Sequence, residues 1–367
     1  MSGLGATLTV LWLAFALGCV FGAVAGRTRF CTMGAIADIA ATGDWRRMRM
    51  WLLAIAVAIL GSSALHAAGQ IDLGKSIYRA SPFFGLSYLV GGLCFGFGMV
   101  LASGCGARTL VRIGGGSVKS FVVFIVLAVV AYMTLRGVLG VFRVTVLEPV
   151  ALRPVGGQDL PALLGRCGVS PTVALAVCAL SLGGGLLVFA LLRGDRLSLD
   201  ELFGGATVGL LVVAGWYVSG HLGYLAEDPE TLQEAFVATN SGRMESLSFV
   251  APQAYTLELL MLWSDSSRRV SFAIASGLGV VVGSLCQALV AGRFRWEGFR
   301  DLDDTVNHLV GAALMGFGGV VAMGCTIGQG ISGVSTLACG SIITFFSIVG
   351  GALLALRYQY RKMPVAP

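Results

Sequence analysis

The chain has 367 residues, of which 56% are hydrophobic and only 12% are charged, and its mean hydropathy is +0.85. A soluble domain carries about 25% charged residues, so this composition excludes a water-soluble globular protein. Several apolar stretches reach the roughly 20 residues that cross a bilayer core as a helix. The sequence therefore predicts an all-α polytopic membrane protein.

The net charge of +6 does not indicate nucleic-acid binding, because the basic residues form short clusters between apolar spans. Such clusters are typical of the cytoplasmic loops of membrane proteins. They predict an N-terminus outside the cell and a C-terminus in the cytoplasm. The clusters are Arg46 with Arg47 and Arg49, Arg193 with Arg196, Arg293 with Arg295, and Arg357 with Arg361.

In chain order, the apolar runs predict nine membrane spans. They lie near 6–26, 50–68, 85–103, 120–140, 170–192, 200–220, 269–291, 306–323 and 341–357. The first run has no basic flank, so we interpret it as a membrane helix and not as a cleaved signal peptide. External loops are expected at 69–84, 141–169 and 221–268. Within the last loop, Ala254 to Trp263 is apolar enough to lie on the membrane surface.

Three further segments are too irregular for spans and too apolar for ordinary loops: 30–43, 104–117 and 324–340. A non-helical backbone at membrane depth survives only where it is buried in protein or lines a wet cavity. These segments therefore predict re-entrant loops with short half-helices. Residues 294–305 are more polar and predict a plain internal loop.

The sequence also contains an internal repeat. Residues Gly91 to Gly106 and Gly311 to Thr326 match at a constant offset of 220 residues, including a Gly-Cys pair in each copy. The predicted topology runs the two copies in opposite directions, and inverted repeats with broken helices are typical of transporters. We predict one membrane domain, 1–367, with approximate repeat halves 1–168 and 169–367.

Three of the nine cysteines open the irregular segments: Cys31, Cys105 and Cys325. If each starts a half-helix, its thiol lies among free backbone N–H groups at the positive end of the helix dipole, where anions bind. The other six are interpreted as buried thiols that pack like small apolar side chains. They are Cys19, Cys94, Cys167, Cys178, Cys286 and Cys339.

The three cysteines also allow two other interpretations, a metal site and simple packing. Zinc sites usually show paired ligands such as C-x₂-C, and the chain has no such pair, so no metal or cofactor is predicted. Crowded helix junctions also favour small residues such as Cys. Three cysteines in matching contexts, two of them related by the repeat, favour function over packing.

Charged and polar residues near the cysteines are the next candidates, since charges inside a membrane are usually functional. Asp38 is expected to form a structural ion pair, with Arg27 or Arg29 as partner. Arg112 either draws an anion inward or faces the inner headgroups. Arg108 and Gln329 lie beside the cysteines in sequence.

At these segments the sequence resembles the YeeE/YedE family of bacterial sulfur transporters. The matching motifs are Arg29-Phe30-Cys31 with Gly34 and Asp38, Gly104-Cys105 with Thr109 and Arg112, and Met315-Gly316-Phe317-Gly318 followed by Gly324-Cys325-x-Ile327-Gly328-x-Gly330. The resemblance implies an hourglass-shaped protein of the bacterial inner membrane. It also implies thiosulfate uptake along these cysteines and a TusA-like sulfurtransferase as cytoplasmic partner.

The predicted function is uptake of thiosulfate, or of a related sulfur or selenium species, without covalent change. The alternative is a membrane sulfurtransferase that forms a cysteine persulfide, although no general base lies near any cysteine in sequence. The supporting residues are Asp38, Gly34 and Thr109. The predicted substrate-binding residues are Cys31, Cys105, Cys325, Gly104, Gly106, Arg112, Gly324, Thr326, Gly328, Gln329 and Gly330.

Overall fold

The structure, a computed structural model, describes residues 3–80, 82–152, 157–194, 196–227, 232–265 and 267–362. The described residues are almost entirely helical, and the one sheet pairs two short strands, β1 (Tyr224–Leu225) and β2 (Ala235–Phe236). The all-α prediction is confirmed.

The helices of the first part of the chain are α1 (Gly3–Thr28), α2 (Thr32–Thr42), α3 (Arg46–Ala67), α4 (Gly85–Leu101), α5 (Gly106–Gly114) and α6 (Val118–Arg136), with a short turn η1 (Leu73–Lys75). The middle part holds α7 (Val138–Phe142), η2 (Arg143–Leu147), α8 (Leu160–Gly165), α9 (Pro171–Cys178), η3 (Ala179–Gly184) and α10 (Gly185–Leu192). The last part holds α11 (Leu199–Tyr217), η4 (Val218–Leu222), α12 (Ala251–Met261), α13 (Phe272–Val290), α14 (Leu302–Val321), η5 (Gly328–Gly333) and α15 (Cys339–Lys362).

Within the described residues, eight helical segments are long and apolar enough to cross a membrane, against nine predicted spans. The remaining predicted span, 306–323, forms the 20-residue helix α14, which falls outside this set. Its first turn carries Asp303 and Asp304, and these lower its hydropathy. The expected loop 141–169 is in part helical, because a short apolar helix occupies Val138–Leu147.

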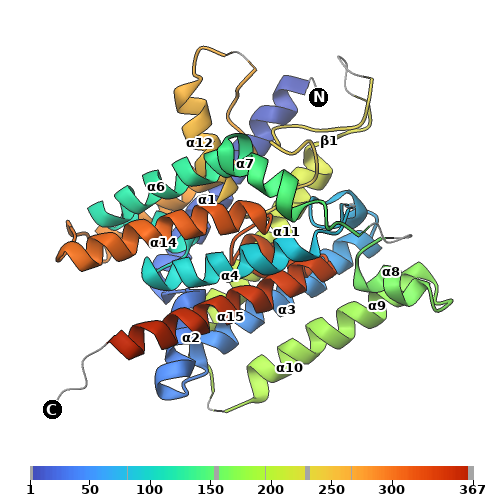
Figure 1. Ribbon diagram of the computed structural model, residues 1–367. Helices are drawn as coiled ribbons and strands as arrows, with labels where there is room; N and C mark the ends of the chain where they lie inside the picture. The colour runs from blue at the N-terminus through green and yellow to red at the C-terminus, as the bar shows by residue number, and fades with distance from the viewer. Residues whose placement is uncertain are drawn as a thin grey trace.

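The long helices run side by side through the molecule, as Figure 1 shows. Helix α1 begins near the top of this view and α15 ends at the lower left, so the two ends of the described chain lie on opposite sides. Helices α8, α9 and α10 lie along one flank. Helix α12 rises from the centre towards the side where α1 begins.

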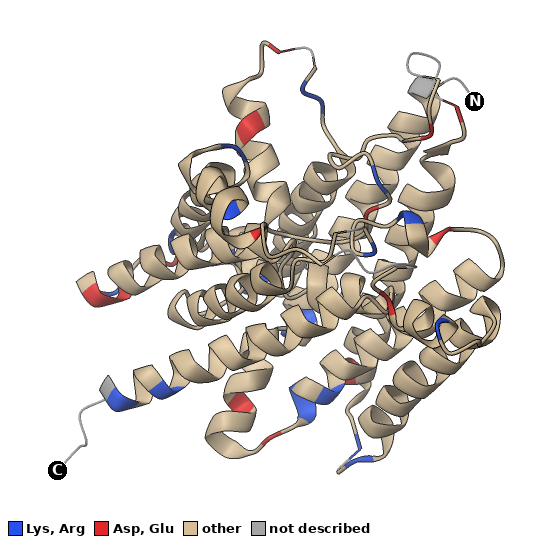
Figure 2. Ribbon diagram, turned by 45° about the vertical axis from the view of Figure 1, so that its right-hand side comes forward, with Lys and Arg blue, Asp and Glu red and all other residues tan. Residues whose placement is uncertain are grey.

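Backbone contacts join the connecting segments at the two ends of the helix bundle. At one end, the three expected external loops meet one another and the start of α15, through the bridges Ser76 to Met244, Phe83 to Leu152 and Asp159 to Ala338. At the other end, Arg27 forms an ion pair with Asp200 at 2.8 Å. Figure 2 shows basic residues at the start of α3, between α10 and α11 and at the end of α15 along this lower edge.

Glycines bring α4 and α14 into backbone contact. A Cβ atom at Gly98 would lie 2.6 Å from the carbonyl oxygen of Gly311, and one at Gly318 would lie 2.6 Å from that of Gly91. Small residues allow membrane helices to pack this closely. As the residue number increases along α4, the number of the contacting residue in α14 decreases. The two copies of the repeated motif therefore cross antiparallel.

Glycines also allow close contact between each copy of the repeated motif and the helix on its other side. A Cβ at Gly96 of α4 would lie 2.0 Å from the carbonyl oxygen of Ile348 in α15, and one at Gly316 of α14 would lie 2.7 Å from that of Leu127 in α6. Helix α1 packs on α13, and α11 packs on α3. Glycine-lined contacts therefore fix the relative positions of the helices that carry the cysteines.

Replacing Gly318 by Ala tests this packing. The new Cβ would lie 2.5 Å from the backbone nitrogen of Phe95, which is too close for any methyl group. We expect overpacking to lower the free energy of unfolding by about 1–3 kcal/mol. Thermal unfolding of the purified protein in detergent measures this loss.

Gly277→Ala is the matched control, because nothing lies within 4 Å of a Cβ at that helical position. Alanine forms helices better than glycine by about 1 kcal/mol, so this variant should be at least as stable as the unsubstituted protein. Equal melting temperatures for the two variants would contradict the packing.

Candidate functional site

Each of the three candidate cysteines stands at the start of a short helical segment. Cys31 is the N-cap of α2 and Cys105 is the N-cap of α5. The carbonyl groups of all three accept the first helical hydrogen bond from the residue four positions on: Ala35 to Cys31 at 3.0 Å, Thr109 to Cys105 at 2.9 Å, and Gln329 to Cys325 at 2.8 Å. Helices therefore start at Cys31 and Cys105 as predicted, whereas the segment after Cys325 is helical only from Gly328, with Ile327 as its N-cap.

A left-handed residue lies two positions before each cysteine. These residues are Arg29, Ser103 and Met323, with φ of 55°, 55° and 59°, and they make up half of the six non-glycine residues with positive φ in the described chain. Such backbone strain persists only where the surrounding structure enforces it, and it clusters at functional sites. The left-handed turn before each cysteine is therefore made by a non-glycine residue and not by the neighbouring glycine.

The glycines next to Cys105 and Cys325 allow neighbouring atoms to approach closely. A Cβ at Gly104 would lie 3.0 Å from Cγ of Arg108, and one at Gly324 would lie 2.9 Å from Cγ of Gln329. A Cβ at Gly106 would lie 2.7 Å from the carbonyl oxygen of Phe249. These glycines let side chains and backbone crowd around the cysteines.

Two of the thiols cap their own helices. Cys31 Sγ accepts a hydrogen bond from the backbone N–H of Gly34 at 3.5 Å, and Cys325 Sγ accepts one from Gly328 at 3.4 Å. Cys105 makes no such side-chain cap. Cys325 and Cys105 are buried, with 0% and 3% exposure, whereas Cys31 is half-buried. The sulfur atoms thus lie at helix starts, where free N–H groups attract anions.

The three thiols form a series with Cys105 in the middle. Cys105 lies within electrostatic range of both Cys31 and Cys325. Thr326 lies next to Cys105, and its buried hydroxyl has no hydrogen-bond partner among the described residues. No group of three or more His, Cys, Asp or Glu side chains in the described ranges is close enough to hold a metal ion together. The thiols are therefore successive positions and not one coordination sphere.

Arg112 lies beside two of these three positions. Its guanidinium group interacts electrostatically with both Cys31 and Cys105, and a Cβ at Gly104 would lie 3.8 Å from its Nη1. Arg112 is half-buried, as is Arg108 beside it. Neither arginine has an ion-pair partner within 4.0 Å among the described residues. Arg112 also interacts electrostatically with Glu297, but this carboxylate pairs with Lys119, so neither arginine has a close carboxylate partner, and this favours a bound anion.

Cys325 is approached from the other side by two hydroxyl groups. A Cβ at Gly328 would lie 2.5 Å from Ser248 Oγ and 3.2 Å from Tyr78 Oη. Both side chains lie beside the Cys325 thiol. Tyr78 is 3% exposed, and its Oη has no hydrogen-bond partner among the described residues. Sequence reasoning did not select either residue.

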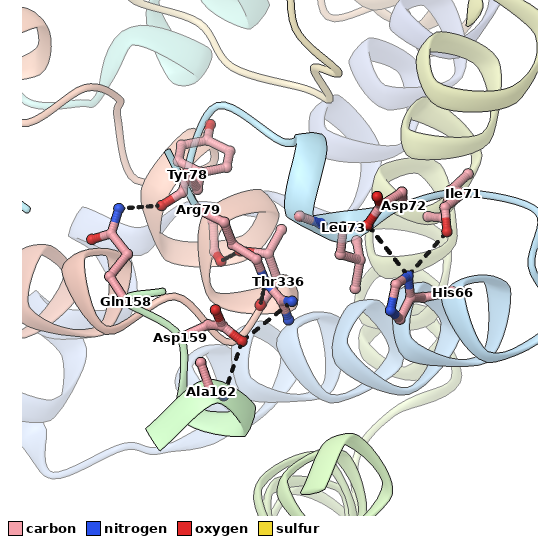
Figure 3. Close-up of polar contacts among 12 residues, drawn as sticks. His66, Ile71, Asp72, Leu73, Tyr78, Arg79, Gln158, Asp159, Ala162 and Thr336 are labelled. Carbon is pink, nitrogen blue, oxygen red and sulfur yellow. Dashed lines mark hydrogen bonds and ion pairs between the residues drawn. The ribbon is translucent and has the colours of Figure 1, made fainter. Parts of the chain in front are cut away.

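Polar contacts hold Tyr78 in place, as Figure 3 shows. Gln158 Nε2 donates a hydrogen bond to the Tyr78 carbonyl oxygen at 3.2 Å. The next residue, Arg79, pairs with Asp159 at 3.3 Å and donates to the carbonyl oxygen of Thr336 at 2.7 Å. These contacts tie the segment after η1 to the start of α8 and to the segment that follows η5.

Helix α12 supplies a further short helix that starts beside the cysteines. Gln253 Nε2 donates to the carbonyl oxygens of Phe249 at 2.7 Å and Gly106 at 3.3 Å. Pro252, Gln253 and Ala254 are buried, and the helix packs against α6 and α13. The prediction that Ala254 to Trp263 lies on the membrane surface is therefore wrong for the first half of this helix.

Buried polar atoms without partners gather around the cysteines. A buried polar group normally has a hydrogen-bond partner, so each such atom requires an explanation. Besides Tyr78 Oη, these atoms are Thr32 Oγ1, Gln253 Oε1, Thr326 Oγ1 and Gln329 Oε1. A polar ligand passing the cysteines would satisfy them.

A cavity of about 330 Å³ reaches the Cys325 end of the series. Ser248 and Met323 line it, and so do the basic residues Arg143 and Arg243. It lies at the end of the bundle where the expected external loops meet. An anion entering this cavity would meet Ser248 directly before Cys325.

Two of the predicted residues contact side chains of α3. Asp38 pairs with Arg47 at 3.2 Å, so its expected structural role is present but the expected partners, Arg27 and Arg29, are wrong. A Cβ at Gly330 would lie 2.8 Å from the ring of Trp51, so this glycine serves helix packing. Thr109 Oγ1 donates to the Cys105 carbonyl oxygen at 3.1 Å and supports the start of α5.

The remaining cysteines do not form a common site. All nine cysteines are free thiols. The expectation that the other six are buried is wrong for Cys167 and Cys286, which are exposed. Cys94 and Cys339 are half-buried, and Cys339, the first residue of α15, lies near Asp159 and Cys178.

Broken helices that bring thiols, unpaired arginines and orphaned hydroxyls together inside an apolar bundle define a polytopic membrane transporter. The chain belongs to the sulphur transport family, whose model matches residues 27–354. It is similar to the thiosulfate transporter TsuA of Escherichia coli (strain K12), with 29% identity over 86% of this chain and 84% of that protein.

Two further relatives agree with this family. The thiosulfate transporter TsuA of Spirochaeta thermophila is 26% identical over 94% of this chain and 98% of its own length. The probable transporter YedE of Escherichia coli (strain K12) is 32% identical, but over only 29% of this chain and 25% of its own length.

Proposed function

We propose that this protein carries thiosulfate into the bacterial cell along the path from the outer cavity past Cys325, Cys105 and Cys31. The observation that supports this most is the series of three thiols at helix starts, with Arg112 beside two of them. The two relatives that match most of the chain are both named thiosulfate transporters.

Thiols would select the substrate by its sulfur atom. Each helix start attracts an anion by roughly 0.3–1 kcal/mol, and by more where it is partly buried, but this attraction does not distinguish thiosulfate from sulfate. Thiosulfate has a terminal sulfur that meets a thiol through a soft S–H···S contact, and sulfate has none. The contact is weak and reversible, as passage through a transporter requires. The anion would cross without covalent change.

The path would run through two inverted copies of one structural unit. The symmetric glycine contacts between α4 and α14 support this, as do the pairs α1 with α13 and α11 with α3. In this proposal the copies are Gly3–Arg136 and Leu199–Lys362, and the helices between 138 and 192 are an insertion. These copies are shorter than the halves expected from the sequence. Short helices from both copies would then meet near the middle of the membrane.

Charge sets an energetic demand on this path. Moving one elementary charge across the membrane changes its free energy by about 2.3 kcal/mol per 100 mV. For a dianion that enters a cell with a negative interior, this free-energy cost is doubled. The transported anion therefore requires a counter-charge, a strong concentration gradient or rapid consumption inside the cell.

The cytoplasmic end would deliver the anion to a TusA-like sulfurtransferase. Cys31, the last thiol of the series, is half-buried at the start of α2, which packs against α3, the helix that begins with Arg46 and Arg47. A soluble acceptor that removes thiosulfate there would sustain inward flow.

Reporter fusions test the proposed orientation. The basic clusters favour a cytoplasmic location for the end of α15, and the segment around Asn240 at the opposite end of the bundle lies outside in this proposal. A reporter that is active only in the cytoplasm should work after the C-terminus and fail when inserted after Asn240. Activity at both positions would contradict both the orientation and the inverted repeat.

Alanine substitutions test the thiol path. We expect Cys105→Ala and Cys325→Ala each to lower the initial rate of radiolabelled thiosulfate uptake at least about tenfold, the equivalent of about 1.4 kcal/mol. Serine should restore little activity, because a hydroxyl is less polarisable than a thiol. Cys94→Ala and Cys178→Ala are the controls and should remain near normal. Full uptake by the Cys105→Ala, Cys325→Ala double variant at normal abundance would contradict the proposal.

Competition tests the substrate. Excess unlabelled thiosulfate should suppress uptake of the label far better than the same excess of sulfate. Arg112→Gln should slow thiosulfate uptake, since it removes the cation shared by Cys31 and Cys105, without making sulfate a better competitor. Arg361→Gln is its control, because this exposed arginine lies at the far end of α15. Equal competition by sulfate in the unsubstituted protein would show that the thiols are not the filter.

A further inference from the structure

The outer cavity contains a buried carboxylate that has no cationic partner. Glu245 is 8% exposed and lies between β2 and α12. Its Oε1 accepts hydrogen bonds from the backbone N–H of Ser241, at 3.0 Å, and from the Ser241 hydroxyl. No ion pair joins it to any described residue within 4.0 Å. Nothing in the transport path described above uses this carboxylate.

The other buried carboxylates of the described chain are neutralised by arginines. Glu258 pairs with Arg268 at 3.2 Å and with Arg136 at 3.7 Å. Asp159 pairs with Arg79 at 3.3 Å. A buried charge without a partner is costly, and such a group instead tends to bind or release a proton. Glu245 is therefore the buried acid best placed to change its protonation state.

The position of Glu245 places that protonation change on the substrate path. Glu245 lines the 330 Å³ cavity, together with Ser248 three residues further on. Ser248 lies against Cys325, the first thiol of the series. A proton taken up at Glu245 thus enters the same space as an anion on its way to the thiols.

The titratable and charged groups around Glu245 come from four segments. Arg143 of η2 and Arg243 of the same loop line the cavity, and Arg143 pairs with Glu148 at 3.4 Å. Tyr255 of α12 and Tyr78 after η1 both interact electrostatically with Glu245. Further out, Lys75 of η1 pairs with Glu234 at 2.6 Å.

These neighbours leave the carboxylate without a stabilising cation. Burial raises the pKa of Glu245, and this effect outweighs the hydrogen bonds from Ser241 and Asn240, which lower it. The protonated form therefore persists to higher pH than for an exposed glutamate. An ionised Glu245 would repel an entering dianion, whereas a protonated one would not.

We propose that Glu245 is the proton-binding group that couples anion uptake to proton influx. The proposal rests on the proposed transport function and orientation. An external proton forms an O–H bond on the carboxylate, and the neutral cavity then admits the anion between Arg143 and Arg243. The O–H bond breaks as the anion leaves towards Cys325, and the proton passes to water that accompanies the anion inward, because thiosulfate is too weak a base to carry the proton itself. Each cycle regenerates the carboxylate and lowers the inward negative charge from two to one.

The test uses the full chain in liposomes that enclose a pH-sensitive dye. External radiolabelled thiosulfate should enter the liposomes and acidify their interior, and an inward proton gradient should speed its uptake. Uptake should fall as the external pH rises through the pKa of Glu245, because the carboxylate then loses its proton. In Glu245→Gln, which keeps an acceptor for Ser241, uptake should no longer respond to the gradient or to pH, and the acidification should be lost.

Glu234→Gln is the matched control, because this exposed carboxylate lies on the same loop and pairs with Lys75. It should keep the proton response of the unsubstituted protein. Glu245→Asp retains a titratable group, so it should retain the response at a shifted pH. This variant also tests the proposal if Glu245→Gln fails to fold.

The possible failures are distinguishable. If the unsubstituted protein takes up thiosulfate without internal acidification, proton coupling is wrong and the transport function stands. If Glu245→Gln acidifies the interior as the unsubstituted protein does, Glu245 is not the proton-binding group. If no labelled thiosulfate enters at all, the transport function itself fails.

Discussion

A helix that stops inside a membrane leaves backbone N–H and C=O groups that no surrounding lipid satisfies. In the proposed transport path, the site is built from three such stops. The carbonyl of each cysteine accepts the first hydrogen bond of the next helical segment, and two of the thiols accept another. The N–H groups that remain at these starts point into the protein. A cysteine there contributes to the helix start and presents a soft sulfur atom to whatever binds the free N–H groups.

Helix packing decides that these stops lie near one another. Gly91 and Gly98 of α4 contact α14 at the backbone, and Gly311 and Gly318 return the same contacts in the opposite direction. Each helix ends a few residues beyond this crossing, at Leu101 and Val321. The glycines therefore do more than tighten the bundle. Because they set the point at which the two antiparallel helices cross, they also set the distance between Cys105 and Cys325.

Much of this arrangement is predictable from sequence, because membrane spans and repeats leave strong local signals. Eight of the nine predicted spans correspond to long apolar helices, and Cys31 and Cys105 do start short helices. Tyr78 and Ser248 were not predictable, because they reach Cys325 only through contacts between distant segments. Likewise, no local pattern marks Ser103 or Met323 as left-handed. The predicted partner of Asp38 was wrong because sequence distance alone does not choose between Arg29 and Arg47, and in the structure the Asp38 carboxylate contacts Arg47 of α3.

The starts of α2 and α12 are not chemically equivalent, although each helix has eleven residues and begins beside the thiols. The first begins at Cys31 and the second at Val250, with the hydroxyls of Ser248 and Tyr78 nearby. In the proposed path, an anion thus meets oxygen atoms first from one face of the membrane and sulfur first from the other. Such asymmetry gives the two faces different half-saturating concentrations and different maximal rates. The two differences offset each other, so that the ratio of maximal rate to half-saturating concentration is the same on both faces. The asymmetry leaves the equilibrium distribution unchanged, because only a free-energy difference between the two compartments, or a coupled second flow, moves that equilibrium. Direction therefore comes from the gradients, and the unequal ends determine the concentration range in which each face works.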